Sequence, residues 1–261
     1  MQAVLPYCRL PMLNVYLLPS QISQIEAAAL NKAVAVVIDV LRATTVITCA
    51  VHSGVRRFIP VLDIAEAERL KTQFPDGSVI LGGERQGLPI PGFDLGNSPQ
   101  DYTPQRVAGK TLIITTTNGT VALHAAKTAK KIIPAAFVNA SAVVESLQDE
   151  DNIAIICAGT CGKETEEDTL LAGCLVERLL DRRHYRLNET GESVRRLWQK
   201  DYTSDSVAEL LRQSTGGQNL IRIGLEDDIF AAAQIDTIDT VAEYEPYFAQ
   251  SSGRTAGVDK A

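Results

Sequence analysis

The chain has 261 residues, of which 45% are apolar and 22% are charged, and its formal net charge is −7. A chain of this length can bury a sizeable hydrophobic core, so we expect one compact domain over 1–261, with a more helical C-terminal half from about residue 181. The acidic balance argues against nucleic acid or an anionic membrane surface as a partner, because both require a basic face.

The cysteines and the first residues favour a cytoplasmic protein. The five cysteines are odd in number and lie mostly in apolar runs, unlike those of a secreted disulfide framework. Residues 1–20 contain three prolines and an arginine but no long apolar run, so we expect neither a signal peptide nor a membrane anchor. No apolar stretch reaches the roughly 20 residues that cross a bilayer.

Short apolar runs rich in β-branched residues alternate with amphipathic stretches through residue 180. The runs predict strands at 14–18, 34–38, 58–62, 79–81, 112–114, 131–134 and 153–158. Helices are expected after Asp63, Asn118 and Asn139, because such residues are preferred at helix starts. The alternation indicates a layered α/β fold. Beyond it, 181–233 predicts helices and 239–244 predicts a late strand.

Three polar loops begin where predicted strands end, at 39–45, 115–120 and 157–168. In an open sheet, the loops at the carboxyl ends of parallel strands meet in one crevice. We therefore expect these loops to form a single site. Their carboxylate, guanidinium and hydroxyl groups suit an anion together with a metal ion.

The first loop combines a carboxylate with a cation. Asp39 can hold Mg²⁺ as a hard oxygen ligand, and Arg42 can fork onto phosphate or sulfonate oxygens. Thr44 then opens a predicted helix, whose first amides favour an anion. The alternative is a structural ion pair between Asp39 and Arg42 beside a capping threonine.

The second loop carries Thr116, Thr117, Asn118 and Gly119 at the start of a predicted helix. Consecutive hydroxyls, an Asn cap and a glycine that admits close backbone approach supply many donors. This arrangement suits a group with three acceptor oxygens. An ordinary strand-to-helix turn is the alternative.

The third loop places Gly159 ahead of four acidic residues at the start of an apolar helix. Carboxylates in a first helical turn are normal partners of the helix dipole, and this interpretation covers most of the four. One of Glu167 and Asp168 can instead face the crevice and bind metal or move a proton, and we favour Asp168.

The segment 82–99 is a long irregular run with five glycines and three prolines. Loops of this length are usually functional or disordered, and the apolar residues of this one argue against disorder. Glu84, Arg85 and Asn97 supply polar groups, so we interpret the segment as a wall of the site. An Ω-loop packed by its own apolar side chains is the alternative.

Four ordered motifs cover these segments. They are IDVLRATT at 38–45, GGERxGxxxxGFDLGNSP at 82–99, TTTNGT at 115–120 and CAGTxGxxxxED at 157–168. The stretch GLEDDIFAAAQIDTIDTV at 224–241 adds a fifth. In these motifs, which span most of its length, the chain resembles the 2-phosphosulfolactate phosphatase family.

The resemblance implies a fold and an activity. The fold would be a three-layer α/β/α arrangement with a largely parallel or mixed central sheet. The activity would be that of a Mg²⁺-dependent hydrolase that removes phosphate from (2R)-2-phospho-3-sulfolactate, a step of coenzyme M biosynthesis. The expected partner is therefore a small anionic phosphorylated substrate.

The resemblance also implies roles for individual residues. Asp39, with Glu84 or Asp168, would hold Mg²⁺, while Arg42 and the loop 116–119 would hold the phosphate. Arg85 would grip the sulfonate or the carboxylate. The expected catalytic residues are Asp39, Arg42 and Asp168, and the expected substrate-binding residues are Thr44, Arg85, Asn97, Thr116, Thr117, Asn118, Gly119 and Gly159.

Several alternatives stay open at this point. The same fold could hydrolyse another phosphorylated hydroxy acid, or bind a phosphorylated metabolite without turnover. The nucleophile could be water or a carboxylate that forms a phosphoenzyme. The mixed apolar and polar C-terminal half would also suit a homodimer, although no interface can be located from the sequence.

Overall fold

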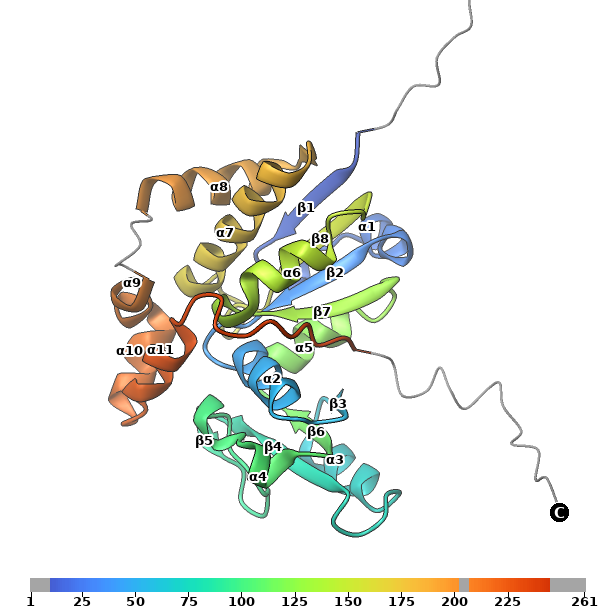
Figure 1. Ribbon diagram of the computed structural model, residues 1–261, viewed down its shortest axis with the longest axis vertical. Helices are drawn as coiled ribbons and strands as arrows, with labels where there is room; N and C mark the ends of the chain where they lie inside the picture. The colour runs from blue at the N-terminus through green and yellow to red at the C-terminus, as the bar shows by residue number, and fades with distance from the viewer. Residues whose placement is uncertain (1–9, 202–206, 245–261) are drawn as a thin grey trace, which may run out of the picture.

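The structure is a computed structural model that describes residues 10–201 and 207–244, and its strands form two sheets (Figure 1). The first sheet has the order β7-β2-β8-β1-β9 and is parallel throughout. Its strands are β1 (Met12–Tyr16), β2 (Val34–Ile38), β7 (Lys131–Ala135), β8 (Asn152–Cys157) and β9 (Arg186–Leu187).

The second sheet has the order β3-β6-β4-β5, in which only β5 runs antiparallel to its neighbour. Its strands are β3 (Arg57–Pro60), β4 (Val79–Arg85), β5 (Leu88–Pro89) and β6 (Thr111–Thr115). The strand pattern in the sequence predicts a layered α/β fold, but it does not indicate that the strands divide between two sheets.

Helices fill the intervals between strands and make up most of the C-terminal part. They are α1 (Gln24–Ala29), α2 (Ala43–His52), α3 (Ile64–Lys71), α4 (Pro104–Val107), α5 (Gly119–Ala125), α6 (Ala140–Ser146), α7 (Glu166–Arg182), α8 (Glu189–Asp201), α9 (Val207–Gln213), α10 (Thr215–Arg222) and α11 (Glu226–Ala232). Short 3-10 helices cover Pro19–Gln21, Leu30–Lys32, Pro99–Asp101 and Phe137–Asn139. In the described parts of 181–233, four of these helices, α8 to α11, follow the end of α7, and the two-residue strand β9 lies between α7 and α8. None of the described helices is long and apolar enough to cross a membrane.

A middle layer of helices separates the two sheets. Helices α2 and α5 contact strands of both sheets, and α2 lies between them in Figure 1. Helices α6, α7 and α8 pack against strands of the first sheet from its outer side, and α3 covers the outer face of the second sheet. The first sheet, with helices on both faces, confirms the predicted α/β/α layering.

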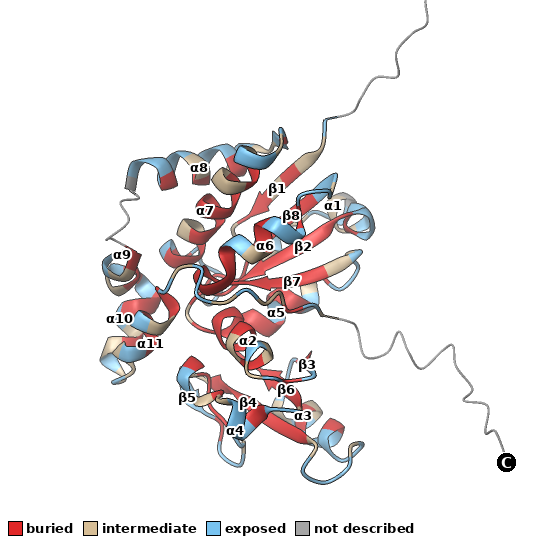
Figure 2. Cartoon of the chain, in the orientation of Figure 1, coloured by how far each residue is buried: buried red, intermediate tan, exposed pale blue. Residues whose placement is uncertain are grey.

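The inner strand β2 shows why the sequence folds in this way. Successive side chains of a strand point to opposite faces. Val34, Val36 and Ile38 therefore join the outer core, with α6 and α7, while Ala35 and Val37 join the middle core, with α2 and α5. Both faces are apolar because both are covered, and Figure 2 shows β2 and β8 buried along nearly their whole length.

The late strand predicted at 239–244 is wrong. Within the described residues, this segment forms no strand, and only Tyr244 makes a single antiparallel bridge to Ile132 of β7. Instead, Val241 packs against the outer core, and Ala242 and Tyr244 pack against the middle core, where Ala242 is buried. These apolar side chains are covered without a strand partner along the whole segment.

Candidate active site

A cavity of about 270 Å³ lies where the loops after β2, β6 and β8 meet the β4–β5 hairpin and α10. The structure therefore brings the three polar loops together with part of the segment 82–99 around one space. Among the residues that the sequence predicts for the site, the cavity is lined by Asp39, Arg42, Glu84, Asn97, Thr117 and Asn118.

Asp39 follows β2 directly and is buried, with 8% of its surface exposed. Its Oδ1 accepts a hydrogen bond from the backbone N–H of Ala43 at 3.2 Å. Burial raises the pKa of Asp39 to about 7, and the negative charges of Glu84 and Glu167 add to the rise. A cation in the cavity would favour the ionised form of this carboxyl group.

Position 119 requires a glycine because Asp39 lies against its backbone. A Cβ atom on Gly119 would lie 2.6 Å from Oδ2 of Asp39 and 2.5 Å from the Cβ of Ala43, so no larger residue fits without displacing the carboxylate. The sequence predicts that Gly119 binds substrate. In the structure, its backbone instead forms the wall against which Asp39 rests.

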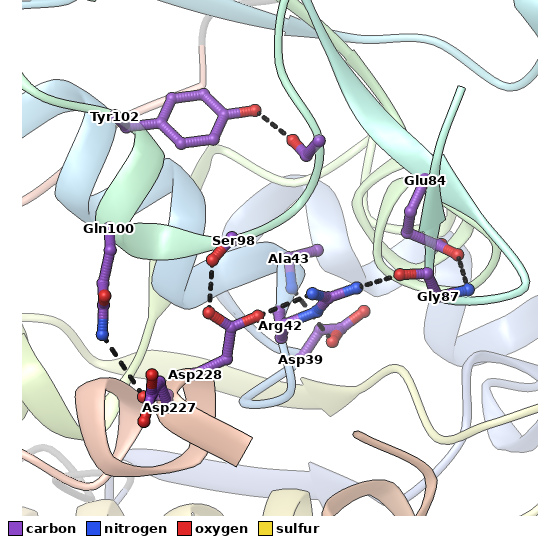
Figure 3. Close-up of polar contacts among 11 residues, drawn as sticks. Asp39, Arg42, Ala43, Glu84, Gly87, Ser98, Gln100, Tyr102, Asp227 and Asp228 are labelled. Atoms are coloured by element: carbon purple, nitrogen blue, oxygen red, sulfur yellow. Dashed lines mark hydrogen bonds and ion pairs between the residues drawn. The ribbon is translucent and has the colours of Figure 1, made fainter. Parts of the chain in front are cut away.

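Glu84 lies in β4 of the second sheet, and it is also buried. Its Oε2 accepts a hydrogen bond from the N–H of Gly87 at 2.7 Å, and its Oε1 accepts one from the N–H of Thr117 at 2.6 Å (Figure 3 shows the first of these). The carboxylate is thus fixed between the β4–β5 hairpin and the loop after β6. Asp39 and Glu84 line one cavity although they come from different sheets.

These two carboxylates are compatible with Mg²⁺. Among the described residues there is no group of three or more His, Cys, Asp and Glu side chains that could hold a metal ion. Mg²⁺ does not require such a group, because it is usually bound by one or two carboxylates together with water and substrate phosphate. Asp39 and Glu84 would supply two such hard oxygen ligands, and both side chains are buried at the cavity.

Asp168, the third acid expected to bind metal, is arranged differently. It is buried, and it is not among the residues that line the cavity. Its Oδ1 accepts the N–H of Val40 at 2.9 Å, and its Oδ2 accepts the N–H of Gly159 at 3.0 Å. Burial, with the charges of Asp39 and Glu167, raises the pKa of Asp168 well above its ordinary value. Asp168 thus ties the loop after β2 to the loop after β8.

Replacing Asp168 by Asn is expected to lower the free energy of unfolding by about 1–3 kcal/mol, because one of the two backbone N–H groups loses its acceptor. Urea denaturation measures this change, and kcat/KM of the folded variant should fall far less than for a variant of Asp39. Glu164→Gln is the control on the same loop, because its carboxylate is exposed and accepts a hydrogen bond from Gln21, so its effect should stay within about 0.5 kcal/mol. A large loss of kcat/KM without loss of stability would show instead that Asp168 takes a direct part in catalysis.

Arg42 lines the cavity and is buried, and its guanidinium is held from two sides (Figure 3). Nη1 forms an ion pair with Oδ2 of Asp228 at 2.6 Å, and Nη2 donates to the carbonyl oxygen of Gly87 at 2.6 Å. Asp228 also accepts a hydrogen bond from the hydroxyl of Ser98. The alternative interpretation, an ion pair between Asp39 and Arg42, is therefore wrong about the partner, because Arg42 pairs with Asp228.

Asp228 cannot be distinguished from its acidic neighbours in the sequence. Acidic residues at a helix start are common, so the three acids that begin α11 look alike in the sequence. The one sequence signal for a functional role of Asp228 is its position within the motif at 224–241. Its burial, with 2% of its surface exposed, separates it from Asp227, which is exposed.

Three predicted binding residues stabilise the loops and do not line the cavity. The hydroxyl of Thr44 bonds the backbone of Asp39. The amides of Ala43 and Thr44, the first two of α2, donate to Asp39, so they are not available for the anion that the sequence suggested. Thr116 exchanges backbone and hydroxyl bonds with Thr120. Gly159 donates its N–H to Asp168.

Arg85 lies away from the cavity. Its guanidinium donates to the carbonyl oxygens of Glu84 and Leu62, at 2.7 and 3.3 Å, and to the hydroxyl of Thr115 at 2.8 Å. Glu84 and Arg85 are neighbours in β4, so their side chains point to opposite faces of the strand. When Glu84 faces the cavity, Arg85 cannot, which removes it from the position expected for binding a sulfonate or carboxylate.

The amide side chains of Asn118 and Asn97 also line the cavity. Oδ1 of Asn118 accepts the N–H of Cys161 at 3.1 Å, which joins the loops after β6 and β8. Asn97 is buried, with 5% of its surface exposed, and its Oδ1 has no hydrogen-bond partner among the described residues. A buried polar atom without a partner is costly unless a water or ligand satisfies it, so Asn97 is a candidate for ligand contact.

Comparison with known proteins decides the family. A family model described as 2-phosphosulpholactate phosphatase matches residues 19–246. The chain belongs to the 2-phosphosulfolactate phosphatase family. This confirms the resemblance that the motifs suggest, and the match includes all five of them.

Relatives in this family cover most of the chain. A protein of Symbiobacterium thermophilum is 42% identical over 207 residues, which are 78% of this chain and 88% of the relative. A protein of Caldicellulosiruptor saccharolyticus is 38% identical over 231 residues, or 86% of this chain and 94% of the relative. One of Thermotoga maritima is 39% identical over 207 residues, or 79% and 87%. Each bears the name "Probable 2-phosphosulfolactate phosphatase".

Proposed function

We propose that this chain is a Mg²⁺-dependent phosphatase that hydrolyses (2R)-2-phospho-3-sulfolactate to 3-sulfolactate and phosphate. Membership of the family and the names of its relatives support a phosphatase acting on 2-phosphosulfolactate. The observation that carries the proposal is the cavity in which the carboxylates of Asp39 and Glu84 lie beside Arg42 and Asn118. The proposal includes a cytoplasmic location and a place in coenzyme M biosynthesis.

The chemistry requires charge neutralisation. A phosphate monoester resists hydrolysis because its anionic oxygens repel a nucleophile. Asp39 and Glu84 would hold Mg²⁺, which when bound supplies positive charge to the phosphate oxygens. Glu84 is kept in place by the two backbone N–H groups that it accepts, and Asp39 by Ala43 and the wall formed by Gly119.

Asn118 and Arg42 are each held by hydrogen bonds that leave other N–H groups of the side chain available for the substrate. Asn118 uses its Oδ1 for Cys161, so its amide N–H groups are turned to other partners. Arg42 uses one N–H of each terminal nitrogen for Asp228 and Gly87, which leaves further N–H groups for a phosphate oxygen. Such donors, held before the substrate arrives, cost no reorganisation during the reaction.

Phosphate release tests the proposal directly. The purified protein is expected to release phosphate from (2R)-2-phospho-3-sulfolactate in the presence of Mg²⁺, to lose this activity in EDTA, and to regain it when Mg²⁺ is added back. A panel of other phosphorylated hydroxy acids, ranked by kcat/KM, checks the substrate. Release that is unaffected by EDTA would remove Mg²⁺ from the proposal. If the substrate raises the melting temperature of the protein but no product forms, the chain is a binding protein and not an enzyme.

A further inference from the structure

The cavity has a second wall, which the three polar loops do not form. Gly216, Leu220 and Ile223 face it from α10 and the residue that follows, at the spacing of one helix face, and Asn219 and Arg222 add polar groups. This wall is separated from Asp39 by almost 180 residues in the sequence. It nevertheless lines the same space as the two carboxylates.

Close packing fixes α10 relative to the carboxylates. A Cβ atom on Gly216 would clash with the carboxylate of Glu167, so the helix backbone rests directly against that side chain. On the other side, a Cβ on Gly87 would lie 2.8 Å from Cδ1 of Ile223. Since Gly87 is also bonded to Glu84 and Arg42, the hairpin holds the end of α10 at a set place along the cavity.

Arg222, the last residue of α10, presents a cation at this wall. Its Nη2 donates to Oδ1 of Asn219 at 2.7 Å, and within 10–201 and 207–244 no carboxylate forms an ion pair with it. Arg42, the other arginine of the lining, is neutralised by Asp228. Arg222 therefore carries an unbalanced positive charge on the lining, with N–H groups left for an anion.

The sulfonate of the proposed substrate is an anion that a free guanidinium could bind. The phosphate and carboxylate of this substrate are attached to the same carbon, whereas its sulfonate is one carbon further away and can extend to a wall distant from the metal ligands. We propose that Arg222, oriented by Asn219, binds the sulfonate of the substrate and selects for it. A guanidinium fork matches the oxygens of a sulfonate as it does those of a phosphate. This inference rests on the proposed function.

The test combines removal of the side chain with removal of the substrate group. Kinetics of wild type and Arg222→Gln are measured on phosphosulfolactate, on 2-phospholactate, which lacks the sulfonate, and on O-phosphoisethionate, which lacks the carboxylate. Arg222→Gln is expected to lower kcat/KM on phosphosulfolactate by about 10- to 100-fold, the usual effect of a charge-assisted hydrogen bond. On 2-phospholactate, the variant and wild type should agree within about threefold, because there is no sulfonate to lose.

The substrate without a carboxylate separates the two anions. Because Arg222 is assigned to the sulfonate, removal of the carboxylate should lower kcat/KM by the same factor in wild type and in Arg222→Gln. If the variant instead becomes insensitive to the carboxylate, Arg222 binds that group and the inference is wrong. An equal loss on all three substrates, or no loss on any, would also overturn it.

Controls distinguish recognition from stability and from failure of the proposed function. Arg196→Gln removes the same charge from an exposed position on α8 outside the cavity, and it should leave all three values of kcat/KM unchanged. Asn219→Ala keeps Arg222 but releases it, and should give a smaller loss that is still confined to the sulfonate-bearing substrates. Wild type that hydrolyses none of the compounds would reject the proposed function itself, whereas a wild type that hydrolyses phosphosulfolactate leaves Arg222 as the only question.

Discussion

Asp39→Asn is expected to lower kcat/KM at least about 100-fold and to abolish the response to Mg²⁺, because a neutral amide cannot neutralise the cation that the phosphate requires. The amide oxygen can still accept the N–H of Ala43, so the fold should persist. Phosphate release measured against Mg²⁺ concentration gives both quantities. Kinetics close to those of wild type, with an unchanged Mg²⁺ response, would exclude Asp39 from the metal site.

The same variant has a stability signature in metal-free protein. Burial raises the pKa of Asp39 from 3.8 to about 7, so the folded state holds a proton that the unfolded chain has released. Its contribution to stability is therefore complete below pH 4 and is lost as the pH rises through about 7. The variant does not titrate, and its free energy of unfolding relative to wild type should increase over this range. Urea denaturation in EDTA at pH 4.5 and pH 8 measures the difference.

Asp228→Ala is expected to lower the free energy of unfolding by about 3–5 kcal/mol. Both side chains of the Arg42–Asp228 pair are only 3% exposed, and removal of one partner from a buried pair leaves an uncompensated charge. Because the hydroxyl of Ser98 loses its acceptor as well, the loop before Pro99 should loosen. Chemical denaturation of the single variants and of Arg42→Ala/Asp228→Ala forms a double-mutant cycle.

The double variant should be less destabilised than the sum of the two single variants, because it leaves no charge unpaired. Asp101→Ala is the matched control, since Arg106 and Asp101 form a pair at 3.3 Å in which both side chains are 48% exposed. Its effect should stay below about 1 kcal/mol. Additive losses in the cycle, or a loss from Asp228→Ala as small as that control, would show that the buried pair does not hold these elements together.

Local patterns are sufficient for the elements at the centre of the fold. The run 34–38 is β2, and the prediction for β8 is displaced by one residue, because a continuous apolar strand depends mainly on being covered. The prediction for β4 stops at Leu81, whereas the strand continues to Arg85. Gly82 and Gly83 suggest a loop in the sequence, but in the structure they allow close approach of Tyr102 and of the backbone of Thr115.

The error in β4 accounts for the main difference in the site. A loop leaves the direction of each side chain open, so Glu84 and Arg85 could both be assigned to the site. A strand sends them to opposite faces, and only Glu84 lines the cavity. Arg222 and Asp228 could not be predicted as site residues from the sequence, for a different reason. No local pattern separates a charged residue in a helix that meets a distant cavity from one that meets solvent.

The division into two sheets bears on the choice of cation. Asp39 follows the first sheet and Glu84 belongs to the second, and in the described chain no strand pairing joins the sheets. The relative position of the two carboxylates therefore depends in part on packing in the helical layer, where Ala43 of α2 and Gly119 of α5 are in close contact. Mg²⁺ binds oxygen at about 2.0–2.1 Å and Ca²⁺ at about 2.3–2.6 Å, a difference comparable to a small repacking of side chains. If Asp39 and Glu84 hold the cation as proposed, its preference between Mg²⁺ and Ca²⁺ should respond to changes in apolar packing at positions that do not touch the ion.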